Sequence, residues 1–394
     1  MHTTRDNLYQ NTSVISDWCR LWPLFACTAA WGLVTVMLGP LLPALVARWN
    51  IQDAQAGTLF SASFGGQLVG AWFATRNLRM SLLAGAALTA LGVVSLAWVG
   101  FPLAHIALFA TGLGLSAGLT AGNVVAGHSS LHRARTLALY NVSWSLGAIA
   151  CPALVRFAGS GDTRFFFLVT TAVVATCGIS AATLPHSLTG ATPAAQRSPE
   201  DISHLPLGLL IALCVCMLLY IGNENALGGW LPSFAARSNS GVKAPTVAML
   251  YWLSELISRL AMALLLFRVP ELVLYRVSLA LLLLSVIFLI LIPHPSVPLL
   301  LSGAVLSGAA IGPIYPLLIA FLLGQFRSHP WIGRLFAAAS LGGAFLPWLT
   351  GVVSSHFGGL RIGLLVPATG VALMLLMSWT IVRGQVAPLQ SRSE

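Results

Sequence analysis

The sequence predicts an all-α polytopic membrane protein with about 12 transmembrane helices in two pseudo-symmetric six-helix bundles. Composition is the first observation behind this prediction. Of the 394 residues, 57% are hydrophobic and only 8% are charged, whereas soluble domains carry about a quarter charged residues. The second observation is the length of the apolar stretches, because a helix needs about 20 apolar residues to cross the hydrocarbon core. The third is a long polar break near the middle of the chain.

Apolar stretches of spanning length follow one another along the whole chain. We predict spans at residues 21–47, 54–75, 79–100, 102–127, 136–158, 164–184, 206–236, 245–267, 271–293, 297–324, 332–355 and 361–383. The break at 185–205 differs from the other loops because it is polar and contains several prolines, which is typical of a linker. The sequence therefore predicts an N-terminal bundle over 1–184, a linker over 185–205 and a C-terminal bundle over 206–394.

The basic residues predict the orientation. With the N-terminus in the cytoplasm, 13 of the 20 Arg and Lys residues fall on the cytoplasmic side, 6 fall on the other side, and Arg259 stays inside the membrane. This bias favours cytoplasmic termini in a cell inner membrane. The net charge of +10 is spread over short loops, so it does not form the basic patch that nucleic acid requires. We expect a monomer surrounded by the lipid bilayer.

A short motif is repeated in the two halves. Ser145–Ala148, followed by Pro152, recurs as Ser340–Gly343, followed by Pro347. Both copies fall in the fifth span of their half. An internal duplication explains this placement, and such repeats are common in secondary transporters, whose substrate site lies between the repeats.

Acidic side chains inside the predicted spans are rare. Of the ten acidic residues, only Glu224 and Glu255 lie well inside spans; the others lie in tails, loops or at a span end. An ionisable group at this depth costs several kcal/mol unless it is paired or faces water, which makes both functional candidates. Arg259 lies four residues after Glu255 and can pair with it on one helix face, or it can reach Glu224 on the neighbouring span. A purely structural ion pair remains an equal alternative.

Glu224 lies in a segment whose composition changes abruptly. Three Gly and Pro232 follow the apolar run within a few residues, which predicts a kinked or partly unwound helix that lines a cavity. Asn223 and Asn225 flank the acid, and Trp230 offers a ring for stacking. The alternative is a helix-packing site, in which the glycines permit close approach of a neighbour.

Polar and aromatic side chains within the spans complete the candidate site, although a tryptophan at mid-membrane is more often a packing residue. The predicted substrate-binding residues are Trp31, Asn123, Asn141, Trp144, Asn223, Glu224, Asn225, Trp230, Trp252 and Tyr315. The predicted ion-coupling or charge network is Glu224, Glu255 and Arg259.

One enzyme motif is present. Gly114–Gly118 matches GxSxG with Ser116 as the nucleophile, but a nucleophilic serine needs a histidine base at similar depth. All nine histidines lie in tails, loops or span ends, so tight helix packing is the favoured interpretation and an intramembrane serine hydrolase is a remote alternative. The sequence contains neither HExxH nor a P-loop. We expect no enzyme activity, no metal and no cofactor.

The chain resembles the major facilitator superfamily, and within it the branch of fucose permease and sodium-glucose-transporter-like proteins. The resemblance rests on Trp31-Gly32, Leu41-Leu42-Pro43, Asn123, the stretch from Tyr220 through Gly222 and Glu224 to Gly229-Trp230, Gly312-Pro313-x-Tyr315-Pro316, and Pro347-Trp348-Leu349-Thr350-Gly351. It covers nearly the whole chain. It implies two six-helix bundles around a central cavity that opens alternately to the two sides.

Three positions depart from the family pattern. The loop that begins at Gly70 lacks the Asp that the superfamily carries there, which removes the usual cytoplasmic gate latch. Gly39 and Leu119 stand where fucose permease has acids, so its proton-coupling scheme does not transfer.

We therefore predict a secondary active transporter for a small polar solute, with sugars as the first class to test. Coupling to H⁺ or Na⁺ would run through Glu224 or Glu255. The alternatives are an uncoupled facilitator, in which both acids are structural, and an exporter of amphipathic compounds, which the high Trp content favours.

Overall fold

The computed structural model describes residues 20–74, 76–128, 133–159, 163–189, 207–239, 241–325 and 332–390. Every regular element within these ranges is a helix. The helices are α2 (Trp22–Val36), α3 (Leu38–Trp49), α4 (Asp53–Phe73), α5 (Leu78–Ser95), α6 (Phe101–His128), α7 (Arg133–Ala158), α8 (Thr163–Ala181), α9 (His186–Thr189), α10 (Leu207–Ser238), α11 (Ala244–Leu265), α12 (Glu271–Leu291), α13 (Val297–Ile311), α14 (Ile314–Gln325), α15 (Ile332–Phe357), α16 (Leu360–Gly363) and α17 (Leu365–Gln390).

Most of these helices suit a bilayer. Among the described residues, nine helices are long and apolar enough to cross a membrane, and the pair α2 and α3, bent by 45°, makes a tenth. The two remaining predicted spans correspond to α4 and α15. These two helices pack along each other, and the Ser61 hydroxyl of α4 donates to the carbonyl of Ala344 in α15 over 2.8 Å. Helices that face protein rather than lipid tolerate more polar residues, and α4 carries several, among them Ser61 and Gln67.

Two predicted spans are broken near their middle. The span predicted at 21–47 divides into α2 and α3 at Met37, and the span predicted at 297–324 divides into α13 and α14 at Gly312-Pro313. Proline explains both breaks, because its nitrogen cannot donate to the carbonyl four residues earlier and its ring crowds that turn. Pro40 removes this bond in the first case, and Pro313 with Pro316 does so in the second.

The helix around Glu224 is continuous, so the prediction of an unwound segment there is wrong. α10 runs without interruption from Leu207 to Ser238, with Pro232 inside it. Its glycines permit close helix packing instead. A Cβ on Gly222 would lie 2.8 Å from the carbonyl oxygen of Gly342, and one on Gly228 would lie 2.7 Å from the Trp252 ring.

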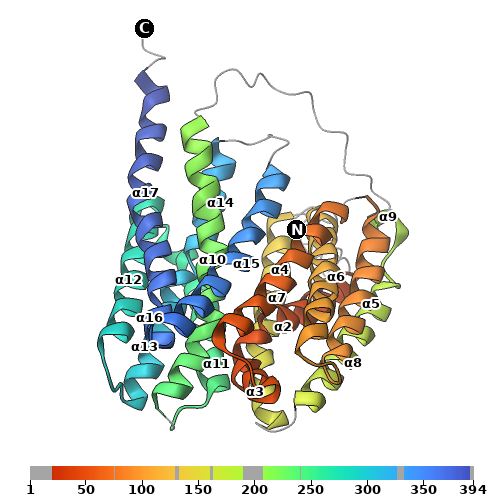
Figure 1. The fold of residues 1–394 in the computed structure, drawn as a ribbon. Helices are drawn as coiled ribbons and strands as arrows, with labels where there is room; N and C mark the ends of the chain where they lie inside the picture. Colours follow the sequence, from red (N-terminus) through yellow and green to blue (C-terminus); the bar gives the residue numbers. More distant parts are fainter. Residues whose placement is uncertain are drawn as a thin grey trace, which may run out of the picture.

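The helices form two groups that are consecutive in sequence. Figure 1 shows α2–α8 on one side, coloured red to yellow, and α10–α17 on the other, coloured green to blue. The end of α9, the start of α10 and the end of α17 lie at the same end of the molecule, here called the linker end; α3 lies at the opposite end, here called the far end. Residues 190–205 of the predicted linker lie outside the described residues, as do Arg5, Arg197, Arg327 and Arg392 of the orientation argument.

The repeated motif occupies the same place in each group. A Cβ on Gly147 of α7 would lie 1.8 Å from the carbonyl oxygen of Ala29 in α2, and one on Gly342 of α15 would lie 1.9 Å from that of Leu218 in α10. In each half, a glycine therefore lets the fifth span cross the first at backbone contact. This correspondence supports the duplication that the sequence predicts.

Glycines also form one contact at the boundary between the halves. Gly39 follows Ala29 by ten residues, as Gly228 follows Leu218. A Cβ on Gly39 would lie 2.2 Å from the carbonyl oxygen of Gly228. Two equivalent positions thus touch each other, as expected where a pseudo-two-fold axis passes.

Arginines at the linker end repeat the same relation. Arg79 at the start of α5 donates to the carbonyls of Leu184 over 3.1 Å and Ala182 over 2.9 Å, just after α8. Arg276 of α12 donates to the hydroxyl and the carbonyl of Ser378 in α17, over 3.1 and 3.2 Å. In each half, the third span is therefore tied to the sixth by one arginine.

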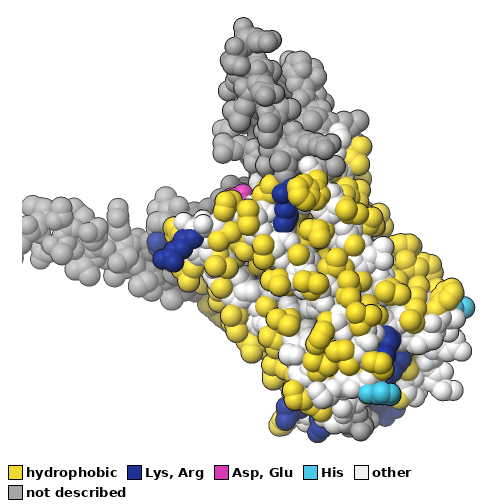
Figure 2. All heavy atoms as spheres, turned by 90° about the vertical axis from the view of Figure 1, so that its left-hand side faces the viewer, with side chains coloured by type: hydrophobic (Ala, Val, Ile, Leu, Met, Phe, Trp, Pro, Cys, Tyr) yellow, Lys and Arg dark blue, Asp and Glu magenta, His cyan; other side chains and the backbone are white. Residues whose placement is uncertain are grey.

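The outer surface is apolar over the span of the helices. Figure 2 shows the face formed by the C-terminal half, where hydrophobic side chains predominate and basic side chains appear near the two ends of the described surface. Large side chains such as Phe267 and Leu264 are 86% and 72% exposed. Such a belt needs lipid around it.

Candidate functional site

The charged residues of the spans gather in one cluster within the C-terminal half. Tyr220 and Glu224 lie one turn apart on α10, and Glu255 and Arg259 lie one turn apart on α11. This spacing places each pair on one helix face. The Tyr315 ring of α14 lies 5.4 Å from the Tyr220 ring, between centroids.

Arg259 connects both glutamates. Its Nη2 donates to Glu224 Oε1 over 3.0 Å and to the Tyr220 hydroxyl over 3.1 Å, and it forms an ion pair with Glu255. The Tyr220 hydroxyl in turn donates to Glu224 Oε1. The sequence offered two partners for Arg259, and in the structure the guanidinium binds both.

The break between α13 and α14 supplies a further acceptor for Arg259. Its Nε donates to the carbonyl of Gly312 over 3.3 Å. In an unbroken helix that carbonyl would bond the nitrogen four residues later, which here belongs to Pro316 and carries no hydrogen. Glycine fits this position because a Cβ on Gly312 would lie 2.7 Å from the backbone carbonyl oxygen of Glu255. The Gly-Pro-x-Tyr-Pro motif thus leaves the Gly312 carbonyl without a helix donor, and Arg259 donates to it.

The three charged side chains differ in accessibility. The Glu255 side chain is 2% exposed, whereas those of Glu224 and Arg259 are 14% and 20% exposed. The cluster holds two carboxyl groups and one guanidinium, so one additional bound cation makes it neutral. Burial strongly favours the neutral state, because charges are expensive in a medium of low dielectric constant. Glu224 is the more accessible of the two carboxyl groups.

Comparison with known proteins identifies the family. Residues 24–330 match the Major Facilitator Superfamily. The chain belongs to this superfamily. No curated protein is similar enough in sequence to match the chain.

Solved structures of this superfamily share the fold. The structure of a D-xylose-proton symporter superposes with a TM-score of 0.74 at 16% identity, covering 91% of this chain and 96% of that one. A mutant of the nucleoside transporter NupG gives 0.73 at 15% identity, with coverage of 93% and 99%. A bacterial homologue of the human lysosomal transporter Spinster, in an inward-facing and unoccupied conformation, gives 0.70 at 16% identity, with coverage of 93% and 98%. At these identities the likeness shows the fold alone. The finer resemblance to the fucose permease branch stays a prediction.

Two predicted tryptophans meet across the boundary between the halves. The Trp144 ring of α7 and the Trp252 ring of α11 lie 6.0 Å apart in an edge-to-face arrangement. Trp252 also lies edge-on to Tyr251, whose hydroxyl donates to the Glu224 carbonyl over 3.4 Å. This aromatic pair therefore joins the N-terminal half to the charged cluster.

The other predicted aromatic residues are packed in the core. Trp230 is fully buried, and its Nε1 donates to the carbonyl of Pro347 over 2.8 Å. Trp31 is 1% exposed, and a Cβ on Gly118 of α6 would lie 2.2 Å from its ring. The geometry of both fits the packing alternative as well as a binding role.

The predicted asparagines do not reach the charged cluster. The Nδ2 atoms of Asn123, Asn141 and Asn225 donate to carbonyls four residues earlier on their own helices, over 3.1, 2.9 and 2.8 Å. Asn123 and Asn141 are exposed. Asn223 is buried and turns toward α17, where its Nδ2 lies 3.7 Å from the sulfur of Met374.

The GxSxG motif serves helix packing. A Cβ on Gly114 would lie 2.4 Å from the carbonyl oxygen of Gly85, which brings α6 against α5. Of the histidines, His105 is on α6 and its Nε2 lies 2.6 Å from the Thr58 hydroxyl of α4. Both observations support the packing interpretation of the segment around Ser116.

Sequence reasoning did not find a second ionic site, which joins the halves at the far end. Arg237 of α10 donates from Nη1 and Nη2 to the two carboxylate oxygens of Asp53, over 2.8 Å each. The Ser354 hydroxyl of α15 donates to the same carboxylate over 2.6 Å, and the amide of Ala54 donates to the Ser355 hydroxyl over 2.8 Å. Asp53 and Arg237 lie far apart in sequence beside loops, so no spacing pattern links them.

The described hydrogen bonds and close glycine contacts between α4 and the C-terminal half lie toward the far end. They run from Asp53 to Phe64, whose ring would lie 2.5 Å from a Cβ on Gly343. Farther along α4, a Cβ on Gly66 or Gly70 would instead touch the backbone of α6, in the same half. The described contacts thus close the far end of the boundary between the halves.

Proposed function

We propose that the protein is a secondary active transporter that moves a small polar solute across a cell inner membrane by alternating access. Membership of the Major Facilitator Superfamily supports the transport role. Sugars and nucleosides are the substrate classes to test first, because similar folds include a D-xylose-proton symporter and a nucleoside transporter.

The observation that carries this proposal is the charged cluster of Glu224, Glu255 and Arg259. A site with one carboxyl group in excess takes up a cation reversibly if one of its carboxyl groups is accessible, and Glu224 is 14% exposed. Cation binding at Glu224 would weaken the hydrogen bonds that its carboxylate accepts from Arg259 and Tyr220. Because α10 and α11 contact the N-terminal half through Gly228 and Trp252, a change here is transmitted to the boundary between the halves.

Among coupling ions, a proton fits this cluster better than sodium. The groups that face Glu224 are the hydrogen-bond donors of Arg259 and Tyr220, and a guanidinium repels a neighbouring metal cation. A proton needs no coordination shell of several oxygens. We therefore infer proton symport, with the substrate bound near Glu224, Asn225, Trp252 and Tyr315 on one side and Asn123, Asn141 and Trp144 on the other.

The closed far end fits one state of the cycle. With both termini in the cytoplasm, as the basic residues predict, the far end faces outward and the linker end faces the cytoplasm. The structure then corresponds to a state closed to the outside. Opening of this end requires Asp53 to separate from Arg237 and Ser354.

Reconstitution tests the proposal. A thermal-shift screen of the purified protein against pentoses, hexoses and nucleosides selects the solute, since ligand binding raises apparent stability. Proteoliposomes with an alkaline interior are then given the labelled solute. We expect uptake above equilibrium in the parent, and in Glu224→Gln only equilibration and counterflow exchange.

The matched control is Glu271→Gln, because Glu271 is an exposed acid at the start of α12. This variant should accumulate solute like the parent. Accumulation by Glu224→Gln would refute the coupling role. Equilibration without any pH or sodium dependence in the parent would instead favour an uncoupled facilitator.

A further inference from the structure

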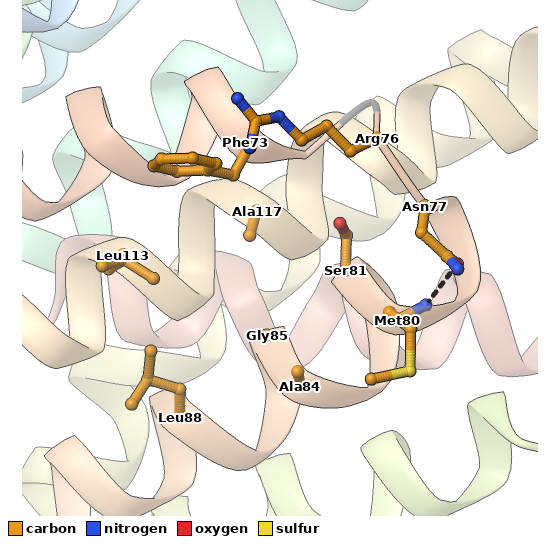
Figure 3. A pocket seen from close by; sticks show the side chains of 10 residues that line it. All are labelled: Phe73, Arg76, Asn77, Met80, Ser81, Ala84, Gly85, Leu88, Leu113 and Ala117. Atoms are coloured by element: carbon orange, nitrogen blue, oxygen red, sulfur yellow. Dashed lines mark hydrogen bonds between the residues drawn. The ribbon is translucent and has the colours of Figure 1, made fainter.

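A lipid-facing groove at the linker end of the N-terminal half has no role in the transport cycle proposed above. It lies between the end of α4, the first half of α5 and the middle of α6, and it encloses about 270 Å³. Figure 3 shows Phe73 and Arg76 along its upper edge, Met80 at one side and Leu88 and Leu113 at the other. Small side chains of α5 and α6 form its floor, among them Ala84.

The groove has the length of one membrane leaflet. Its lining on α5 runs from Asn77 to Leu88, which corresponds to roughly 16 Å along a helix axis. Half of the hydrocarbon core is about 15 Å thick. An apolar channel of this length, parallel to the helices, matches an extended acyl chain.

The groove faces lipid rather than the interior of the bundle. Gly112 of α6 packs against α4 and Gly114 packs against α5, so the intervening Leu113 points out between the two helices. Around the groove, Trp72 is 60% exposed and Met80 is 58% exposed. In a membrane-spanning protein, only lipid covers such side chains.

The basic side chain of Arg76 lies at the upper edge of the groove. The Arg76 guanidinium carbon lies 4.6 Å from the centroid of the Phe73 ring, and none of the acidic side chains that the structure describes forms an ion pair with it. Nearby Arg79, by contrast, donates to the carbonyls that follow α8. Asn77 accepts a hydrogen bond from the Met80 amide over 3.0 Å and so fixes the start of α5 beside Arg76.

We propose that this groove binds one anionic phospholipid, with its phosphate on Arg76 and one acyl chain along α5. A basic side chain at the headgroup level next to an apolar groove attracts lipids with net negative charge. A zwitterionic lipid satisfies the site less well, because its ammonium group lies close to the same guanidinium. The lipid would hold the loop between α4 and α5 in place where the family's usual Asp is absent.

Native mass spectrometry of the purified full chain tests this with an equimolar mixture of phosphatidylglycerol and phosphatidylcholine of identical chains. We expect one phosphatidylglycerol to be retained about fivefold over phosphatidylcholine, the factor for one arginine at an anionic surface. Arg76→Gln should remove this preference. Arg268→Gln, an exposed arginine at the same end of the other half, should keep it.

A second pair of variants tests the groove itself. Ala84 is exposed within the groove, whereas Ala87 is exposed on the same helix outside it. Ala84→Trp should fill the groove and abolish retention of the lipid, whereas Ala87→Trp should not. Both changes add an apolar side chain to a lipid-facing surface, and unchanged thermal unfolding verifies the fold. Equal retention of both lipids by the parent, or equal losses in Arg76→Gln and Arg268→Gln, would overturn the proposal.

Discussion

The first spans of the two halves pack in equivalent ways through their backbones but differ in the charge of their side chains. Ala29 of α2 and Leu218 of α10 occupy equivalent places against the glycines of the repeated motif. Six residues further on, the N-terminal half has Thr35 and the C-terminal half has Glu224. The Thr35 hydroxyl donates to the Trp31 carbonyl of its own helix over 2.8 Å, whereas Glu224 binds residues of two helices.

A second pair of equivalent positions has the same residue, arginine, in both halves but different hydrogen-bond partners. Arg48 follows Ala29 by 19 residues, as Arg237 follows Leu218. Arg48 donates to the carbonyls of Leu96 and Ala97 in its own half, over 3.0 and 2.7 Å. Arg237 instead reaches across to Asp53. Arg48 thus stabilises packing within the N-terminal half. Arg237 instead stabilises the contact between the two halves.

These differences show which parts of a duplicated fold are free to change. The glycine contacts that fix the crossing of the helices are kept in both halves, while the side chains beside them have diverged. Ion chemistry then concentrates in one half, and the other half offers neutral polar and aromatic groups. Three predictions probe this division, in order of decreasing effect on stability.

Arg259→Met should have the largest effect, because it leaves two carboxyl groups in the membrane without their cation. Removal of one partner from a buried ion pair costs about 3–5 kcal/mol. We expect a large loss of thermal stability in detergent, measured by intrinsic fluorescence during heating. The double variant Glu255→Gln with Arg259→Met should recover part of the loss, since the two changes are coupled. An unstable double variant with no recovery would mean that Glu255 does not depend on Arg259.

Gly147→Val and Gly342→Val should destabilise the protein to a similar, intermediate extent. In both, new atoms would overlap a backbone carbonyl, at 1.8 and 1.9 Å from the Cβ position, and overpacking of this kind costs about 1–3 kcal/mol. Gly208→Val is the control, because nothing lies within 4 Å of that position. Unfolding temperatures that differ widely between the two variants would contradict equivalent packing of the halves.

Arg237→Gln should have the smallest effect on stability and a clear effect on conformation. Its ion pair is exposed, with the arginine side chain 43% accessible, and such pairs contribute about 0.2–1 kcal/mol. Loss of the contact should nevertheless open the far end. Spin labels at residues 164 and 243, exposed at that end of the two halves, should report longer distances.

Arg48→Gln is the matched control for that measurement. It should lower the unfolding temperature more than Arg237→Gln, because Arg48 bonds carbonyls within its half, and it should leave the spin-label distances unchanged. Longer distances in both variants would remove the distinction between the two arginines.

The sequence predicts the all-helical fold and the approximate spans, because length and hydropathy are local properties. It also predicts the pairing of Glu255 with Arg259, since four residues along a helix define one face. It offers Glu224 as the alternative partner but does not predict that Arg259 binds both acids at once, because that arrangement depends on the relative rotation of α10 and α11. The glycines on either side of Glu224 are ambiguous for a related reason. Glycine either weakens a helix or permits a close neighbour, and only the presence of Gly342 and Trp252 beside them decides between the two.

The positions of the prolines also predict which backbone carbonyls lack a helix donor, which the prediction of spans does not take into account. Pro316 leaves the carbonyl of Gly312 without a helix donor, and this is the carbonyl that Arg259 binds. The Asp53–Arg237 contact, in contrast, has no sequence signature, since it joins a helix start in one half to a helix end in the other.

The contact between Gly39 and Gly228 has a practical consequence. When two bodies rock about a point where their backbones touch, displacement there is close to zero and increases with distance from it, as at the fulcrum of a lever. Labels placed beside these glycines would report almost the same separation in every state and would serve as an internal ruler. Labels at the two ends of the helices would carry the full amplitude of the movement.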